Sequence, residues 1–440
     1  MAKKSEIQYL DYTLLLSVLM IVVIGILTIY STGFDPIDKL NNGLYRKQVL
    51  WFGIGFFLMM AISFINYRRL GDYSLYLYIG ILFVLTLTTI FGTPVRNARA
   101  WISFGFFSVQ PSEFMKLAYI ILMAKYLEIR ERDIQNFREL MIPSLITLVP
   151  VFIIYMQPDF GTAMIFIPIF FTMLFLGGAD VSHLGSIISI AVIALLVPMI
   201  LTYTEWIGEG NETINPIITF LKGSDLLFII AGTLLAVSIV TFILHFFFIK
   251  KIYRSIYIPS MVLSLGLFLS VFIQHFLKDY QKKRILVFLN PNLDPHGSGY
   301  NVIQSKIAIG SGGIFGKGFL QGTQSQLGFL PEKTTDFIFS VVAEEWGLFG
   351  SIILLVLFAL LIFKGIQIAL EANDKFGMLL ASGITTMIFF HMIINIGMSL
   401  GIMPVTGLPL SFVSYGGSNL VMSMMAVGML LNIRMRKLSR

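Results

Sequence analysis

The residues best suited to chemistry gather in one stretch of an otherwise apolar chain, FLNPNLDPHGSGYNVIQSKIAIGSGG, which runs from Phe288 to Gly313. It contains one carboxylate, Asp294, and one lysine, Lys306, among amides, serines and glycines. A carboxylate before a proline either accepts a proton from a substrate or closes a turn through its own side chain. Glycine, lysine, glutamine and serine together suit a phosphate or a sugar, because the backbone can approach the ligand closely and donors are at hand.

Basic residues continue on both sides of this stretch. Nine of the 38 glycines fall between Gly297 and Gly328. The surrounding segment 278–335 carries these cations: Lys278, Lys282, Lys283, Arg284, Lys306, Lys317 and Lys333. Further cations, expected on the same side of the membrane, are Arg46, Lys47, Arg96 and Arg99. An anionic ligand would explain them, but so would plain solvated side chains, because long loops escape the charge bias of membrane insertion.

Charged residues inside apolar spans form a second group. Each costs about 2.5–3.5 kcal/mol at the bilayer centre unless it is paired or faces water. Glu113 and Lys116 stand at i and i+3 in QPSEFMKLAY, so they share a helix face and can pair. The pair is either structural or lines a polar cavity. Asp159 in QPDFGTA either caps the helix that follows or has a functional role.

The remaining polar residues of the spans are interpreted as structural. At least one of Glu344 and Glu345 must face the protein interior, and His391 and Asn395, at i and i+4, favour interhelical hydrogen bonds over a catalytic pair. With five histidines, none in a two-histidine motif, and no cysteine, the chain shows no metal constellation, and a cysteine-based redox role is excluded. No P-loop or nucleophile elbow is present. A transporter of an anionic lipid or solute and an intramembrane transferase both fit these residues.

The elements that position these residues are membrane spans. The chain is 56% hydrophobic and 12% charged, with a mean hydropathy of +0.84, which indicates an all-α integral membrane protein. Apolar runs predict a bundle of about twelve transmembrane helices. They lie near 12–31, 47–65, 74–92, 112–127, 142–157, 161–177, 184–202, 226–249, 255–277, 336–363, 377–398 and 411–432.

Lysine and arginine collect in alternate loops of this bundle, which predicts that those loops and both termini are cytoplasmic. The clusters are Arg68 and Arg69; Arg130, Arg132 and Arg138; Lys250, Lys251 and Arg254; and Arg434, Arg436, Lys437 and Arg440. The long loop at 278–335 is then extracytoplasmic. Without repeats or low-complexity tracts, the chain is predicted to be a single polytopic membrane domain, 1–440.

Five longer motifs together resemble the SEDS family (shape, elongation, division and sporulation). They are ARAWISFGFFSVQPSEFMKL, QPDFGTA, DPHGSGYNVIQSKIAIGSGGIFGKG, GTQSQLGFLPEKTTDFIFSVVAEEWGLFG and MPVTGLPLSFVSYGGSNL, which span about Arg96 to the C-terminus. GTQSQLGFLPE after QSKIAIGSGG is similar to the rod-shape branch rather than the division branch. The resemblance implies a peptidoglycan glycosyltransferase that polymerises lipid II during cell elongation, on the outer face of the bacterial inner membrane. The alternative is a flippase for the same lipid.

The resemblance also implies partners. A polymerase without a serine-acylase motif needs a class B penicillin-binding protein as its transpeptidase, and other membrane proteins of the elongation complex are expected beside it. No nucleic acid and no cofactor are expected. Whether a divalent cation accompanies the pyrophosphate of lipid II is not indicated by the sequence.

Site residues follow from the same motifs. Asp294 matches the family's proposed catalytic acid. Extension of a β-1,4-linked strand from an α-linked pyrophosphate donor inverts the configuration at the anomeric carbon. One displacement and one base are therefore sufficient. The expected pyrophosphate ligands are Arg99, Lys116, which Glu113 would hold in place, and Lys306. The sugars are expected near Gln304, Ser305 and the 310–313 backbone. The other substrate-binding positions implied are Trp101, Asp159, Gly312, Gly313, Lys317, Gln324, Glu332 and Asp336. Neutralising Lys116 is expected to leave thermal unfolding little changed.

Three departures from the family pattern stand out. Thr334 occupies the position of a usual histidine, so no role is carried over to that side chain. Asn290 replaces the first acid of a usual pair, which leaves Asp294 alone. The family usually has ten spans, so the segment 202–254 is predicted to be an insertion that raises the number of helices by two. The segment 278–335 is predicted to be the active-site loop.

Overall fold

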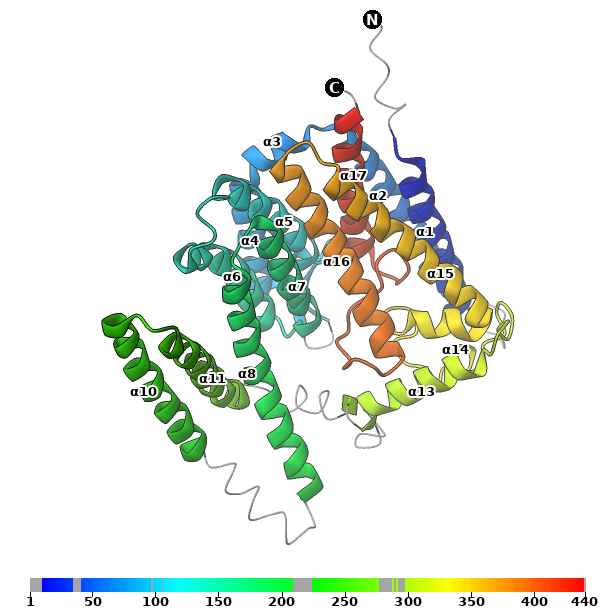
Figure 1. Ribbon diagram of the computed structural model, residues 1–440. Coiled ribbons are helices and arrows are strands. Elements are labelled where there is room, and N and C mark those ends of the chain that lie inside the picture. The colour runs from blue at the N-terminus through cyan, green and yellow to red at the C-terminus, as the bar shows by residue number, and fades with distance from the viewer. Residues whose placement is uncertain are drawn as a thin grey trace, which may run out of the picture. The chain divides into compact units, whose positions relative to one another are not determined.

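The computed structural model describes residues 10–34, 41–95, 98–105, 107–208, 224–276, 287–288, 290–291 and 297–438. Most of the described chain is helical, and it divides into two compact units (Figure 1). The first unit comprises Met1–Ala179 and Asn301–Arg440, and the second comprises Asp180–Tyr300. The all-α class predicted from the sequence is confirmed. The single domain and the insertion at 202–254 stay predictions, and residues 209–223 of that segment lie outside the described part.

The first unit contains most of the helices. They are α1 (Tyr12–Thr32), α2 (Leu44–Phe64), α3 (Tyr67–Asp72), α4 (Ser74–Phe91), α5 (Pro111–Ile129), α6 (Met141–Met156), α7 (Phe160–Gly177), α13 (Ser298–Ser311), α14 (Thr323–Gln326), α15 (Ile338–Leu370), α16 (Lys375–Ser399) and α17 (Gly417–Leu438). A short 3-10 helix, Phe137–Leu140, precedes α6.

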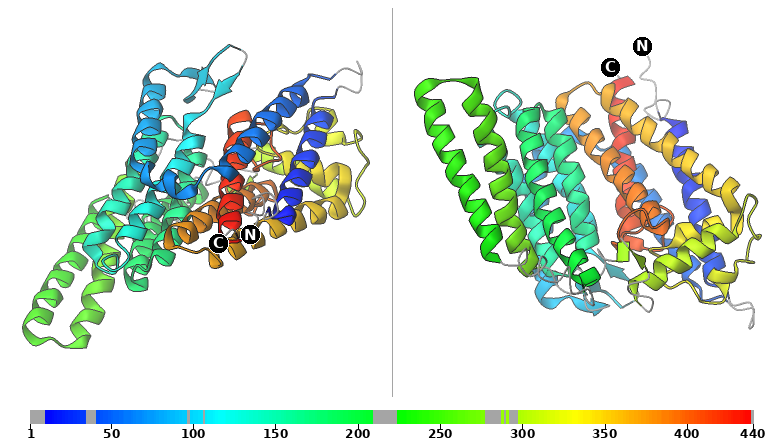
Figure 2. Two further views of the ribbon diagram at one scale, coloured as in Figure 1. Left: turned by 90° about the horizontal axis from the view of Figure 1, so that it is seen from above. Right: turned by 60° about the horizontal axis from the view of Figure 1, so that its bottom comes forward.

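Three helices form the centre of this unit. Helix α17 packs against α2, α5, α15 and α16, and α16 also packs against α5, α7 and α15 (Figures 1 and 2). In the most apolar 18-residue stretch of each helix, 89% of the stretch is buried in α17 and 72% in α16. In α5 both charged residues near its first turns, Glu113 and Lys116, are buried as well. The core is therefore made of helices that carry polar groups.

The described part holds eleven helices that are long and apolar enough to cross a membrane. All twelve predicted ranges coincide with a helix, but the range 112–127 corresponds to α5, which carries Glu113, Lys116, Lys125 and Glu128 and is not among the eleven. The predicted count of about twelve spans is thus not confirmed. Charge in a helix that is enclosed by others weakens the apolar signal on which a span count rests.

The second unit consists of three long helices, α8 (Val181–Gly208), α10 (Ser224–Phe248) and α11 (Lys251–Phe276). Helix α11 packs against both α8 and α10. A small core forms where Leu201, Leu227 and Val271 meet. Small residues allow close approach here, since a Cβ added at Gly266 would lie 2.8 Å from the Ile193 side chain.

Two segments outside the long helices bear on the site. Between α4 and α5, strands β1 (Thr93–Val95), β2 (Ala98–Ser103) and β3 (Ser108–Val109) form an antiparallel sheet in the order β1-β2-β3. The segment expected as a long loop at 278–335 contains helices α13 and α14. These elements carry Arg99, Trp101 and most of the predicted substrate-binding positions.

Two predicted spans differ from the helices found. Helix α17 begins at Gly417 rather than near residue 411, because the preceding residues bond a neighbouring loop: the Tyr415 N–H donates to the Thr334 carbonyl at 2.9 Å. Helix α15 is broken at Gly347, whose φ of 69° and ψ of −161° are open to glycine. Both deviations depend on tertiary contacts that an apolar run does not record.

A buried asparagine closes the end of α2 against α17. The Asn432 amide donates to the Ile62 carbonyl at 2.9 Å and the Ser63 carbonyl at 2.7 Å, and its oxygen accepts from the Tyr67 N–H at 3.3 Å. The residue is 1% exposed. Carbonyls at a helix end have no partner within the helix, so this side chain satisfies groups that would otherwise be buried unpaired.

We predict that Asn432→Ala lowers the free energy of unfolding by about 1–3 kcal/mol, because it strands buried carbonyls and an N–H. The measurement is thermal unfolding in detergent followed by tryptophan fluorescence. Ser423→Ala on the same helix is the matched control, since the Ser423 hydroxyl is buried with no hydrogen-bond partner in the described part. Equal melting temperatures for the two variants would contradict the prediction.

Candidate functional site

A buried polar cluster lies among α5, α16 and α17. The Lys116 ammonium bonds both carboxylate oxygens of Glu113, at 3.0 and 2.9 Å, and lies 2.9 Å from Nε2 of His391. The Asn419 amide donates to Glu113 Oε2 at 2.8 Å. None of the four residues is more than 5% exposed. A lysine and a glutamate are stable in an apolar interior only with this kind of complete pairing.

Local sequence explains how each member is positioned. Pro111 starts α5 at a place where no N–H is needed, which puts Glu113 in the first turn and Lys116 one turn later on the same face. His391 lies on α16 and Asn419 in the first turn of α17. His391 Nδ1 lies 3.2 Å from the Pro409 carbonyl, which only accepts, so Nδ1 carries the proton and Nε2 accepts from Lys116.

Asp159 lies at the start of α7, next to the cluster. Its Oδ1 accepts from the Thr162 N–H at 3.1 Å, as expected of a cap, and its Oδ2 accepts from the Gln110 amide at 2.8 Å. Burial raises the pKa of the Asp159 carboxyl, the Thr162 hydrogen bond opposes this, and the Glu113 charge adds to the rise. Asp159 therefore caps α7, and the functional role that the sequence left open as the alternative stays a prediction.

One face of α16 holds two loops in place. The Asn395 amide donates to the Leu408 carbonyl at 2.7 Å and to the Asp336 carbonyl at 2.8 Å, one turn from His391. The predicted interhelical contact is found for His391, which lies 2.9 Å from the Lys116 ammonium on α5, whereas Asn395 bonds loop carbonyls instead of another helix. Loop 400–416 and loop 330–337 are thereby fixed beside the Lys116 cluster.

A second cluster is built around Glu344 on α15. Its carboxylate accepts from the backbone N–H groups of Gln324 at 2.8 Å and Ser325 at 3.0 Å, at the start of α14. Lys317 bonds the same carboxylate at 3.0 Å and the Thr323 hydroxyl at 2.6 Å. Glu344 is fully buried, so the Lys317 ammonium and the Gln324 and Ser325 backbone tie loop 317–326 to α15, while the substrate roles of the Lys317 and Gln324 side chains stay predictions.

Other predicted positions are spread along the described part. Ser305 is buried and its hydroxyl bonds the Ser340 hydroxyl and the Ser399 carbonyl, both at 2.6 Å. Lys306 and Arg99 are exposed, and Gln304 and Trp101 are half-buried. A Cβ added at Gly401 would lie 2.3 Å from the Lys306 side chain, so that side chain packs directly against the Gly401 backbone.

The predicted glycine contacts are made with protein. A Cβ added at Gly312 would lie 2.0 Å from the Ala343 carbonyl oxygen, and the Gly313 carbonyl accepts from the Leu348 N–H at 2.9 Å. The close approach that these glycines permit is therefore to the backbone of α15. Their role toward a sugar stays a prediction.

Asp294, the predicted base, lies outside the described residues. Glu332 and Asp336 are half-buried on loop 330–337, which the Asn395 amide holds. Sequence reasoning missed Asn419 as a member of the Lys116 cluster, and it treated His391 as separate from Lys116. The available signal was a polar side chain at the start of an apolar helix, directly after SYGG.

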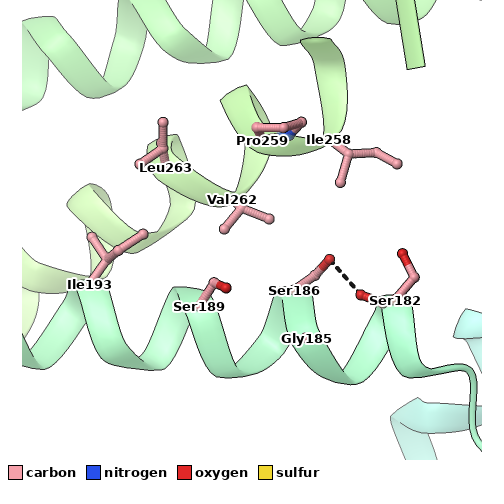
Figure 3. Close-up of a pocket in the computed structure, with 9 residues that line it drawn as sticks. All are labelled: Ser182, Gly185, Ser186, Ser189, Ile193, Ile258, Pro259, Val262 and Leu263. Atoms are coloured by element: carbon pink, nitrogen blue, oxygen red, sulfur yellow. Dashed lines mark hydrogen bonds between the residues drawn. The ribbon is translucent and has the colours of Figure 1, made fainter. Parts of the chain in front are cut away.

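The metal-ligating residues and one groove of the described part can be compared with these positions. Among the described residues, no group of three or more His, Asp or Glu could hold a metal ion. A groove of about 480 Å³ lies within the second unit, between Ser182, Ser186 and Ser189 of α8 and Pro259 and Val262 of α11 (Figure 3). Its Ser186 hydroxyl bonds the Ser182 carbonyl at 2.8 Å, and none of the predicted site residues lines it.

Comparison with known proteins identifies the family. The profile of the FtsW, RodA and SpoVE family, described as cell cycle protein, matches residues 12–207 and 226–438. The chain belongs to the SEDS family. The profile leaves out 208–225, which falls within the segment predicted as an insertion. As a SEDS protein with many helices long enough to span a bilayer, the chain is a polytopic membrane protein.

Individual relatives match over the full length. The chain is 37% identical to the peptidoglycan glycosyltransferase RodA of Treponema pallidum over 97% of this chain and 98% of that one. It is 32% identical to the peptidoglycan glycosyltransferase MrdB of Escherichia coli K12, covering 97% and 93%. Among solved structures, a chain from a peptidoglycan synthase complex matches with a TM-score of 0.65 and 28% identity, covering 97% and 98%. The structure of Thermus thermophilus RodA matches with a TM-score of 0.59 and 25% identity, covering 97% of this chain and 96% of that one.

The buried pairing corrects the expectation that neutralising Lys116 leaves unfolding little changed. We predict that Lys116→Met lowers the free energy of unfolding by about 3–5 kcal/mol, because the buried Glu113 loses its counter-charge. Thermal unfolding in detergent measures this. Lys125→Met on the same helix is the control, since its 2.9 Å pair with Glu128 is only half-buried, with side chains 30% and 29% exposed, and solvent can hydrate a charge left alone there. Equal shifts for both variants would refute a pairing that stabilises the fold.

Proposed function

We propose that this SEDS protein is a peptidoglycan glycosyltransferase that polymerises lipid II into glycan strands during cell elongation. The observation that carries the proposal is the full-length likeness to two proteins named as peptidoglycan glycosyltransferases. The branch assignment is supported by GTQSQLGFLPE after QSKIAIGSGG and by the RodA name of relatives and structural neighbours.

The chemistry assigned to the site is an inverting transfer. Asp294 accepts the proton of the attacking sugar hydroxyl, the new glycosidic bond forms at the anomeric carbon, and undecaprenyl pyrophosphate leaves with the electron pair of the broken bond. Because a pyrophosphate leaves readily when cations neutralise its charge, no second carboxylate is needed as an acid.

The cations suited to direct contact are the exposed ones, Arg99 and Lys306. Lys116 has all three ammonium protons committed to Glu113 and His391, so it would reach the pyrophosphate only by exchanging one of these acceptors. We assign Lys116 and Glu113 to holding the shape of the site, because their paired charges cancel. Gln304 and Trp101, which are half-buried, are assigned to the sugars.

The proposed setting is the bacterial inner membrane, with both termini in the cytoplasm and the active site on the outer face. The alternating basic loops support this orientation. The proposed partner is a class B penicillin-binding protein, which would cross-link the strands that this chain makes. The structural neighbour from a peptidoglycan synthase complex supports the association.

We predict that purified protein with lipid II yields glycan polymer and that Asp294→Asn abolishes it while retaining lipid II binding, because only a proton acceptor is lost. Polymer is measured on gels and binding by fluorescence with labelled lipid II. Asp133→Asn, which neutralises an exposed carboxylate 3.3 Å from Arg130, is the matched control and should keep full activity.

Two outcomes would count against the proposal. Polymer formation by Asp294→Asn at the wild-type rate would remove the base assignment and leave the residue as a turn former. Transbilayer movement of lipid II without polymer, measured with wild-type protein in vesicles, would favour the flippase alternative.

A further inference from the structure

Helices α1 and α15 pack together, and two polar contacts mark the ends of their shared length. At the end where the chain begins, Lys364 on α15 bonds Asp11, the cap of α1, at 3.2 Å. At the other end, the Ser31 hydroxyl of α1 bonds the Glu345 carboxylate of α15. Figure 1 shows both helices running between these two ends.

The length of helix between the two contacts can be compared with the thickness of the bilayer's hydrocarbon core. Twenty residues separate Asp11 from Ser31 and nineteen separate Glu345 from Lys364. At about 1.5 Å per residue, each stretch is about 28–30 Å long, which matches a hydrocarbon core about 30 Å thick. The side chains between the ends are apolar except for a few hydroxyls, of which those of Ser17, Thr28 and Ser351 bond carbonyls of the preceding turn. Asp11, Lys364 and Glu345 carry ionisable groups, so the hydrocarbon boundaries fall at the two contacts.

Aromatic residues gather at the boundary near Ser31. The Tyr30 ring lies 5.0 Å from the Tyr45 ring and 6.3 Å from the Phe319 ring, measured between centroids. Tyrosines are enriched where a bilayer meets water, because one end of the ring is apolar and the other can be solvated. The aromatic cluster therefore supports a hydrocarbon boundary at the Ser31–Glu345 contact.

The backbone of loop 312–318 is bonded to α15 at this boundary. The Gly318 N–H donates to the Glu345 carbonyl at 3.0 Å, level with the boundary. The Leu348 and Phe349 N–H groups donate to the Gly313 and Ile314 carbonyls, at 2.9 and 3.0 Å. Leu348 lies three residues further along α15, just past the break at Gly347 and toward the bilayer centre, so residues 313–315 lie inside the boundary.

Glycines make this pairing of loop and helix geometrically feasible. A Cβ added at Gly316 would lie 2.1 Å from the Glu345 carbonyl oxygen, and one added at Gly347 would lie 2.3 Å from the Gly316 nitrogen. The exposed backbone groups of the broken helix are satisfied by the loop, which is a requirement for irregular backbone at membrane depth.

The two side chains at the turn of this loop are apolar and exposed. Ile314 is 64% and Phe315 is 83% exposed. They continue a stripe along α15 in which Leu348, Ile352 and Val356 are between 48% and 55% exposed. We infer that Ile314 and Phe315 form an apolar tip that inserts into the acyl chains of the bilayer and holds the loop bearing Lys317 at the membrane surface.

The occupant is lipid because the tip is continuous with the face of α15 that the bilayer must cover. A soluble partner cannot reach a side chain inside the hydrocarbon boundary. The inference goes beyond the proposed function and does not depend on it, since it concerns contact with the bilayer rather than with a substrate.

The absence of cysteine from the chain permits a direct test with single labels. Phe315→Cys and, as a second site, Ile314→Cys would carry an environment-sensitive fluorophore, with the full-length protein in nanodiscs. Val356→Cys serves as a mid-bilayer control. Gln321→Cys, exposed and three residues beyond Gly318, serves as a water-facing control. The quenchers are phospholipids with a nitroxide near the top of the acyl chain and, separately, iodide in the buffer.

We predict that labels at 314 and 315 are quenched several-fold more strongly by the lipid nitroxide than the label at 321, and several-fold less by iodide. Iodide quenching at both tip positions equal to that at 321 would overturn the inference. Protection from both quenchers would overturn it in favour of a protein neighbour. Quenching only by a spin-labelled lipid-linked substrate would show that the tip contacts the substrate's chain instead of the bilayer.

Discussion

The ion pair between Lys116 and Glu113 is the constraint on which the centre of the protein depends. Neither charge could remain in an apolar core alone, and their mutual attraction offsets the lost hydration only because His391 and Asn419 complete the hydrogen bonding. Each of these partners comes from a different helix. The pair therefore fixes how α5, α16 and α17 pack, and it does so beside Asp159 at the start of α7.

The irregular segments of the first unit obey the same requirement for satisfied polar groups. His391 and Asn395 use one face of α16 to bond carbonyls of loop 400–416 and loop 330–337. Glu344 does the equivalent for loop 317–326, with a carboxylate that accepts from two backbone N–H groups and from Lys317. Loops that would be unstable in lipid are thus held by a few side chains on rigid helices.

This arrangement has a consequence for the proposed chemistry. The side chains of the family motifs divide into those bonded within the protein, such as Ser305 and Lys317, and those that are exposed, such as Arg99 and Lys306. In the proposed reaction, substrate contact falls most naturally to the exposed set. The buried Lys116 would then serve the reaction through the shape of the site.

The sequence by itself determined the helices, because an apolar run of sufficient length has few alternatives in lipid, and each of the twelve predicted ranges overlaps a helix. It also determined the family, the i, i+3 pairing of Glu113 with Lys116, and the capping role available to Asp159. Only the tertiary structure decided the late start of α17, the break at Gly347 and the recruitment of His391 and Asn419 to the lysine. Those features depend on contacts between residues that are tens to hundreds of positions apart, and periodicity along a chain carries no information about which helices become neighbours.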